Sequence, residues 1–157
     1  MNAGQVLGAY RRSTRLPVVG RGAFSLAVAL RAPYFLTIAP TVVELRPNHA
    51  AVRVRKWWGV HNHIGTVHVI AVANGLEMAM GVLAEATVPP HLRWLPKGME
   101  LEYLAKSSST LLATADTDPS DWEHPGELPV RVQATREDGT VVVRGTIRLH
   151  ITAKPSQ

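Results

Sequence analysis

The sequence contains no cysteine. This absence excludes disulfide bonds and thiolate metal sites, and it removes any indication of a small secreted scaffold held together by disulfides. Disorder is excluded by composition, because 46% of the 157 residues are hydrophobic, a share typical of folded globular proteins. The length is sufficient for one domain with its own core.

Acidic residues are absent from the start of the chain, where no Asp or Glu precedes Glu44. The five arginines of this segment supply the whole net charge of +5, because the other 12 basic residues equal the 12 acidic residues of the chain in number. They are Arg11, Arg12, Arg15, Arg21 and Arg31. We expect residues 1–32 to form a helical arm with solvated arginines that ends at Pro33, because proline breaks a helix.

The apolar side chains of this arm are expected to pack on the rest of the domain. They are Phe24, Leu26, Ala27 and Leu30. An organelle transit peptide and a basic helix lying on an anionic membrane stay open as alternatives. An export signal is not favoured, since Arg21 and Arg31 interrupt the apolar segment and no small-x-small cleavage site follows. We therefore expect a cytoplasmic protein. Nucleic-acid binding is not expected, because the arm lacks interleaved aromatics and the rest of the chain is neutral.

Residues 33–157 have the pattern of one α+β domain, with alternating strands before and after one long apolar helix. Asp138-Gly139 predicts a hairpin turn, and the few charges at 141–143 predict a sheet edge there. We expect the helix to run from about Val67 to Glu85. The expected strands are Thr41–Arg46, Ala50–Lys56, Glu100–Lys106, Leu111–Thr117, Leu128–Arg136 and Val141–Thr152.

The expected helix is almost entirely apolar. Between Val67 and Ala84 its polar side chains are His68, Asn74 and Glu77. A helix that is apolar on every face is expected to be buried, and these three polar residues make it a poor transmembrane segment. A buried carboxylate without a partner costs free energy, so we expect Glu77 to be buried and to have either a structural partner or a chemical role.

The spacing of four residues in this region resembles a known active-site segment. Asn62, Gly65 and His68, with Glu77 nine residues after the histidine, resemble the phenylacetate-degradation type of hotdog-fold thioesterases. The pattern of that family is Asn-x-x-Gly-x-x-His-Gly-Gly, followed by Asp or Glu nine residues after the histidine. The flanking segments resemble an uncharacterised subfamily of the same fold. The resemblance implies a hotdog fold, in which a curved antiparallel sheet wraps around one long central helix, here with an extra N-terminal helix.

The resemblance also implies an activity, the hydrolysis of an acyl-CoA or aryl-CoA thioester. Glu77 would be the base or the nucleophile. Asn62 would orient water or hold the carbonyl oxygen, and His68 would fix the loop at the helix start. Coenzyme A would enter as part of the substrate, and no other cofactor is implied. The residues expected to contact the substrate are Gly65, Thr66, Val69, Ile70, Met80 and Lys106.

Val69 and Ile70 depart from the family pattern, because they replace its two glycines. They are expected to narrow the cleft, and they favour an alternative, an acyl- or CoA-binding hotdog protein without turnover. A second alternative is a hotdog dehydratase, because His63 precedes Glu77 by fourteen residues. A metal site is not expected, since the nearby histidines have mixed spacing and no cysteine accompanies them.

A homo-oligomer, either a dimer or a dimer of dimers, is the expected assembly. A single hotdog unit leaves a sheet edge unpaired, and such edges are normally covered by a partner. The resemblance implies that the active site lies between subunits, with Glu77 of one chain facing Asn62 and the helix start of the other.

Overall fold

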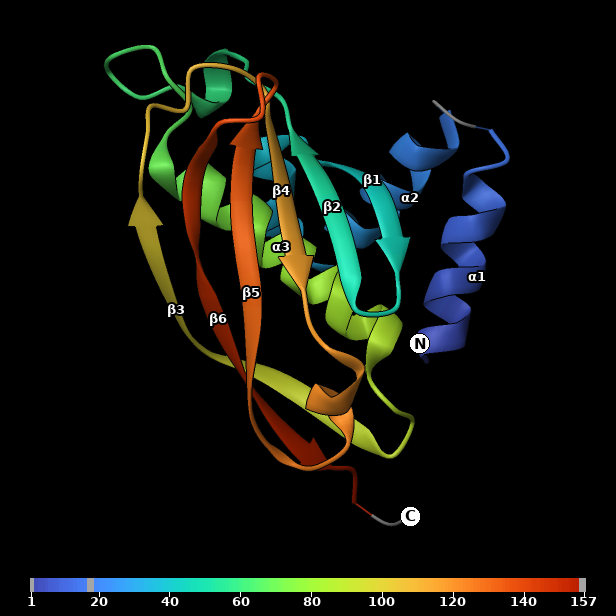
Figure 1. Ribbon diagram of the computed structural model, residues 1–157. Helices are drawn as coiled ribbons and strands as arrows, with labels where there is room; N and C mark the ends of the chain where they lie inside the picture. The colour runs from blue at the N-terminus through green and yellow to red at the C-terminus, as the bar shows by residue number, and fades with distance from the viewer. Residues whose placement is uncertain (1, 17–18, 156–157) are drawn as a thin grey trace.

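A six-stranded antiparallel sheet curves around one long helix in the computed structural model, which describes residues 2–16 and 19–155 (Figure 1). The helices are α1 (Ala3–Ser13), α2 (Val19–Arg31) and α3 (Val69–Thr87), with short 3₁₀ helices η1 (Pro33–Ile38), η2 (Trp58–Val60) and η3 (Pro119–Trp122). The strands are β1 (Thr41–Arg46), β2 (His49–Val54), β3 (Leu92–Tyr103), β4 (Leu111–Asp116), β5 (Gly126–Arg136) and β6 (Val141–Ala153). This is the hotdog fold predicted from the sequence.

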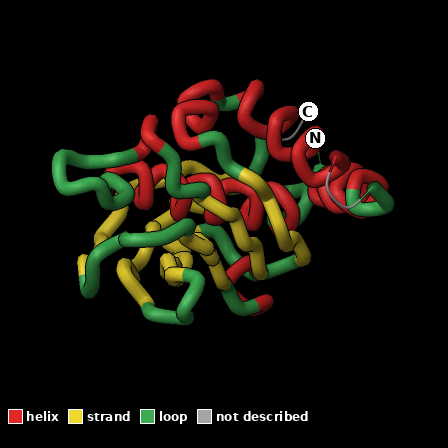
Figure 2. Tube along the Cα trace, turned by 90° about the horizontal axis from the view of Figure 1, so that it is seen from above, coloured by secondary structure: helices red, strands yellow, loops and turns green. Residues whose placement is uncertain are grey.

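Helix α3 lies against one face of the sheet, and the N-terminal helices lie on the same side (Figure 2). It begins with a cap, in which the His68 side chain accepts a hydrogen bond from the backbone N–H of Ile70. By length and hydropathy α3 could cross a membrane, but most of it is buried in the fold. No other helix in the described residues meets those criteria. The apolar character of α3 is therefore that of a core helix.

The strand order is β1-β2-β4-β5-β6-β3, so β1 and β3 form the two edges of the sheet. The predicted edge at residues 141–143 is wrong. Val143 pairs with Ala134 of β5 on one side and with Tyr103 of β3 on the other. The lack of charge at this point reflects burial inside the sheet, since Val142 and Val143 are both buried.

Strand β3 begins eight residues earlier than the expected strand at Glu100, and it contains Pro96. Proline cannot donate to a strand ladder and is tolerated at edges and bulges. Both conditions hold here, because β3 is an edge strand and its register with β6 shifts between Pro96 and Gly98. The extension carries Trp94 alongside α3.

The N-terminal arm consists of two helices and not one, and it covers the β1 edge of the sheet. The Ser25 hydroxyl accepts a hydrogen bond from the Val42 N–H, and the Tyr10 hydroxyl donates one to the Val43 carbonyl, both at 2.8 Å. Phe24 is buried as expected. Three of the expected packing residues are instead exposed, namely Leu26, Ala27 and Leu30. The face that packs also contains small residues, Ser25 and Ala29, which let α2 approach the sheet closely.

Candidate functional site at the start and outer face of helix α3

The loop before α3 is held together by the Asn62 side chain. Its carbonyl oxygen accepts hydrogen bonds from the backbone N–H groups of Ile64 and Thr66, both at 3.1 Å. Its amide donates to the Thr66 hydroxyl at 2.8 Å. Gly65 adopts a positive φ of 76° within this turn, a conformation that glycine takes without strain. Asn62, Gly65 and Thr66 thus form one rigid turn.

His68 connects this turn to the helix. Its Nδ1 accepts from the Ile70 N–H at 3.1 Å, and its backbone N–H donates to the Val60 carbonyl at 2.8 Å. In the part of the chain that the structure describes, no acceptor binds the backbone N–H of Val69, at the first helical position. An unpaired N–H at a helix start favours negative charge.

The Ile70 side chain is 54% exposed at the helix start. It lines a pocket of about 210 Å³ together with Tyr34, Thr37, His68 and Asn74. The Asn74 amide donates to the Thr37 hydroxyl at 3.2 Å, so this polar residue of α3 is used to fasten η1 to the helix.

Lys106 lies on an exposed loop that docks beside the helix start. The next residue, Ser107, is buried, and its carbonyl accepts a hydrogen bond from the Val67 N–H at 2.9 Å. Arg136 holds the same loop by donating to the Ser108 hydroxyl at 3.2 Å. The structure therefore brings Lys106 to the same end of the molecule as Asn62 and His68.

Glu77 is not buried, contrary to the prediction. It is exposed on the outer face of α3, while its neighbours Leu76 and Met78 are completely buried. Across residues 2–16 and 19–155, no hydrogen bond or ion pair holds its carboxylate. The prediction failed because Glu77 lies on the side of α3 that faces away from the sheet, where the described residues leave its side chain exposed.

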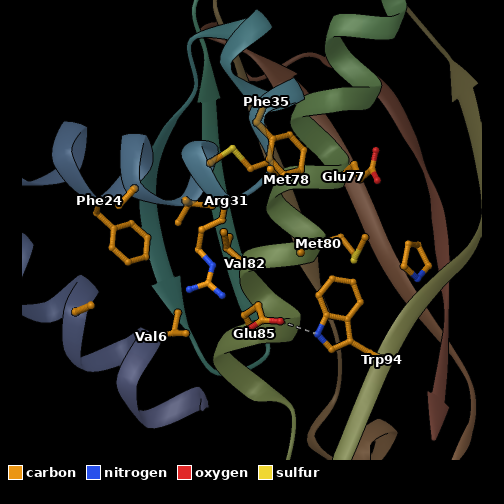
Figure 3. A pocket seen from close by; sticks show the side chains of 16 residues that line it. Val6, Phe24, Arg31, Phe35, Glu77, Met78, Met80, Val82, Glu85 and Trp94 are labelled. Carbon is orange, nitrogen blue, oxygen red and sulfur yellow. Dashed lines mark hydrogen bonds between the residues drawn. The ribbon is translucent and has the colours of Figure 1, made fainter. Parts of the chain in front are cut away.

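An apolar groove of about 430 Å³ runs along the outer face of α3 beside Glu77 (Figure 3). Glu77, Met80 and Trp94 lie on one side of the helix, and Phe24 and Arg31 approach from the other. The predicted substrate contact Met80 is buried and contributes to this groove.

The predicted site residues therefore fall into two groups that one chain does not bring together. Asn62, Gly65, Thr66, His68, Val69, Ile70 and Lys106 lie around the start of α3, whereas Glu77 and Met80 lie along its outer face. His68 caps the helix and Glu77 follows nine residues later, so roughly 13 Å of helix axis separates their backbones.

Trp94 and Gly81 are among the groove residues that were missed from the sequence. Trp94 was missed because its strand was not predicted to begin so early. Gly81 was missed because a glycine in a helix has no chemistry of its own to draw attention. Its position four residues after Glu77 was the available signal, since residues four apart share a helix face.

The described residues contain no group of three or more His, Asp or Glu side chains arranged to hold a metal ion. Of the histidines in the 61–68 loop, His68 has a structural role, because it caps α3.

The fold has close counterparts among solved structures. A crystal structure described as genomics APC5556 is 40% identical, with a TM-score of 0.82, over 93% of this chain and 99% of that one. A protein of unknown function from Pseudomonas aeruginosa, described as a probable thioesterase, is 17% identical with a TM-score of 0.75, over 83% of this chain and 93% of its own. A hypothetical thioesterase protein with coenzyme A from Streptococcus pneumoniae is 16% identical with a TM-score of 0.60, over 74% and 88%.

No curated protein sequence matches the chain. A family model does match, over residues 20–151, and its description is a domain of unknown function, DUF4442. These residues include α2 from Gly20 onward, α3 and all six strands up to Ile151. The chain belongs to the DUF4442 family and has the hotdog fold.

Proposed function

We propose that this protein is a cytoplasmic hydrolase of acyl-CoA thioesters in which Glu77 is the general base or the nucleophile. The observation that carries the proposal is the Glu77 carboxylate itself. It stands on a mostly apolar helix, at the rim of an apolar groove, and within the described residues no partner engages it. A free carboxylate beside an apolar binding groove can activate water or attack a carbonyl carbon.

The names of two structural neighbours support the reaction class. The Pseudomonas aeruginosa protein is described as a probable thioesterase, and the Streptococcus pneumoniae one as a hypothetical thioesterase protein with coenzyme A. At these identities the likeness concerns the fold. We further propose that this chain is related to the phenylacetate-degradation type, because Asn62, Gly65, His68 and Glu77 keep its spacing.

The start of α3 is the proposed carbonyl site. Hydrolysis of a thioester passes through an oxyanion, which is stabilised by backbone N–H groups at a helix start. The Val69 N–H is available for this role, and His68 and the Asn62 turn fix its position. The Ile70 side chain would narrow the approach and thereby restrict which thioesters reach the helix start.

Two chains are needed to complete the proposed site, because Glu77 and the helix start of one chain are far apart. Two features favour a dimer or a dimer of dimers. In the described residues, the edge of β3 away from β6 has no pairing strand, and β3 exposes Leu95, Met99 and Tyr103. Helix α3 is also exposed at Glu77, although it has the composition of a fully buried helix. A second copy would cover both and would place its helix start against Glu77.

Binding of an acyl-CoA without turnover is the second candidate. The observations that favour it are the exposed Ile70 at the helix start and the Asn62 amide, which is engaged within its own loop. This candidate predicts binding of acyl-CoA with no release of free thiol at any protein concentration.

The proposal is tested by mixing two variants that damage different halves of the shared site. Glu77→Gln removes the base, and Ile70→Trp blocks the helix start at an exposed position that tolerates a larger side chain. Each variant alone is expected to release little thiol from a panel of acyl-CoA and aryl-CoA thioesters. Mixed and allowed to exchange subunits, they should regain activity, because a heterodimer contains one intact site.

The matched control mixes Glu77→Gln with wild type at the same total concentration. If the mixed variants are no more active than the sum of the two alone, while subunit exchange is demonstrated by mass spectrometry, the shared site is wrong. Wild type that releases no thiol from any member of the panel would favour the binding protein.

A further inference from the structure

The groove beside Glu77 is elongated along helix α3. Glu77, Gly81 and Glu85 line it at intervals of four residues, which places them on one stripe of the helix. Eight residues of α-helix span about 12 Å. With a volume of about 430 Å³, the groove falls in the range of sites that bury a small ligand.

Gly81 sits at the centre of this stripe, in the interior of a helix where glycine is entropically unfavourable. Packing does not require it. A Cβ added at Gly81 would meet only the Trp94 ring, at an ordinary contact distance of 3.8 Å. Gly75 of the same helix is different, because a Cβ there would lie 2.4 Å from a Val54 methyl group. Gly75 is thus explained by close packing against β2, whereas Gly81 is explained by the space that it leaves in the groove.

The wall opposite Gly81 is held in place. The Trp94 indole N–H donates to the Glu85 carboxylate at 3.2 Å, the hydrogen bond drawn as a dashed line in Figure 3. The width of the groove at Gly81 is therefore set by a fixed indole ring and by the absence of a side chain on α3.

Most of the remaining wall residues are apolar, and they come from several parts of the chain. Phe24 and Val28 belong to α2, Phe35 to η1, and Met78 and Met80 to α3. Methionine side chains adapt to flexible apolar ligands. A groove that is elongated along the helix and has adaptable walls fits a linear aliphatic chain better than a compact aromatic ring.

We propose that Gly81 is the specificity-determining residue of this protein, and that it keeps the groove open for the unbranched medium-length acyl chain of the thioester. The carbonyl end would lie at Glu77 and the chain would run past Gly81 toward Glu85. This proposal rests on the proposed function for the identity of the substrate, but the binding that it describes is measurable without turnover.

The test compares Gly81→Leu with Gly22→Leu. Both substitutions place leucine at a helix glycine, but Gly22 is exposed on α2, has nothing within 4 Å of an added Cβ, and does not line the groove. Isothermal titration would measure the affinity for a hydrolysis-resistant decyl thioether of coenzyme A and for free coenzyme A. Wild type and Gly22→Leu should bind the decyl thioether more than about tenfold more tightly than coenzyme A, because several methylene groups are buried. Gly81→Leu should lose most of this difference and keep its affinity for coenzyme A.

Ala27→Leu serves as a second variant, because it narrows the same groove from α2 and keeps a helix-forming residue. Ala27→Leu should also lose most of the affinity difference between the decyl thioether and free coenzyme A. A folding defect in one of the two variants would therefore not decide the test. A phenyl thioether should bind wild type less tightly than the decyl thioether. A preference for the phenyl compound would overturn the assignment to linear chains.

The two proposals fail in different ways. If wild type hydrolyses no thioester while Gly81→Leu loses the chain-dependent affinity, that result would support the acyl-chain groove and reject the hydrolase. Thioester hydrolysis with the same chain-length profile in wild type, Gly81→Leu and Ala27→Leu would uphold the hydrolase and overturn the groove. A change of oligomeric state in Gly81→Leu, with chain-dependent affinity retained, would also overturn it, because the groove would then be a subunit contact.

Discussion

The hydroxyl of Ser25 on α2 accepts a hydrogen bond of 2.8 Å from the backbone N–H of Val42 on the edge strand β1. The same hydroxyl donates a hydrogen bond to the Arg21 carbonyl at 2.6 Å, so it acts as both donor and acceptor inside the protein. Ser25 and Val42 are buried. Ser25 thus provides an acceptor for the buried Val42 N–H on the edge strand, and it links the N-terminal arm to the hotdog sheet.

Replacing Ser25 with alanine should therefore destabilise the whole domain. The Val42 N–H would remain buried without an acceptor, which costs about 1–3 kcal/mol. Urea denaturation of Ser25→Ala and wild type measures this difference. Ser120→Ala is the matched control, because Ser120 is exposed. Equal loss of stability in both variants would show that the hydrogen bond to Val42 is not the cause.

The opposite edge of the sheet should pair with a second copy. Leu95 and Met99 are exposed on β3, and lysine on an edge strand opposes pairing between sheets. Light scattering should find wild type at least dimeric at micromolar concentration, and Leu95→Lys with Met99→Lys should shift it toward the monomer. Leu112→Lys, on the interior strand β4 at 37% exposure, should leave the assembly unchanged. A wild-type monomer would remove the basis of the shared site.

The fold could be predicted from the sequence because alternation of apolar residues and turn chemistry agree along most of the chain. The Asp138-Gly139 turn is an example, since Gly139 has a φ of 83°, as the predicted hairpin requires. Helix α1 could not be predicted from apolar spacing as a helix separate from α2. Its signal was local, a capping box in which Asn2 and Gln5 exchange hydrogen bonds at 2.9 Å.

The sequence indicates candidate site residues, but it does not indicate how they are arranged in space. Apolar periodicity indicates that a helix face is kept apolar, but it does not indicate which chain covers that face. For this reason Glu77 was expected inside the chain and lies on its surface. Trp94 could not be placed beside Gly81 from the sequence, because that contact depends on how the edge strand β3 passes α3.

The turn between β5 and β6 should show a pH dependence of its own. Hydrogen bonds from Thr140 and from Arg136 lower the pKa of Asp138 from 3.8 to about 2. A carboxylate with a lowered pKa stabilises the fold above its unfolded pKa, and this contribution is lost as the pH falls from about 4 to about 2. An NMR titration of the Asp138 carboxyl carbon should find a midpoint near pH 2.

Asp138→Asn should accordingly melt below wild type at pH 6, and the two melting temperatures should converge at pH 2. The neighbouring Glu137→Gln serves as the control, because Glu137 is exposed and should show little difference at either pH. If the melting temperatures of Asp138→Asn and wild type differ by the same amount at pH 6 and at pH 2, the assigned pKa of Asp138 is contradicted.

Turnover by Glu77→Gln, measured beside its affinity for the substrate, is the most direct test of the central claim. Glutamine is close in shape to glutamate, and the position is exposed, so the variant should fold and should bind the decyl thioether of coenzyme A as wild type does. If Glu77 is the base or the nucleophile, kcat for acyl-CoA hydrolysis should fall by roughly two powers of ten or more. An active wild type and a Glu77→Gln variant with the same kcat would contradict the account.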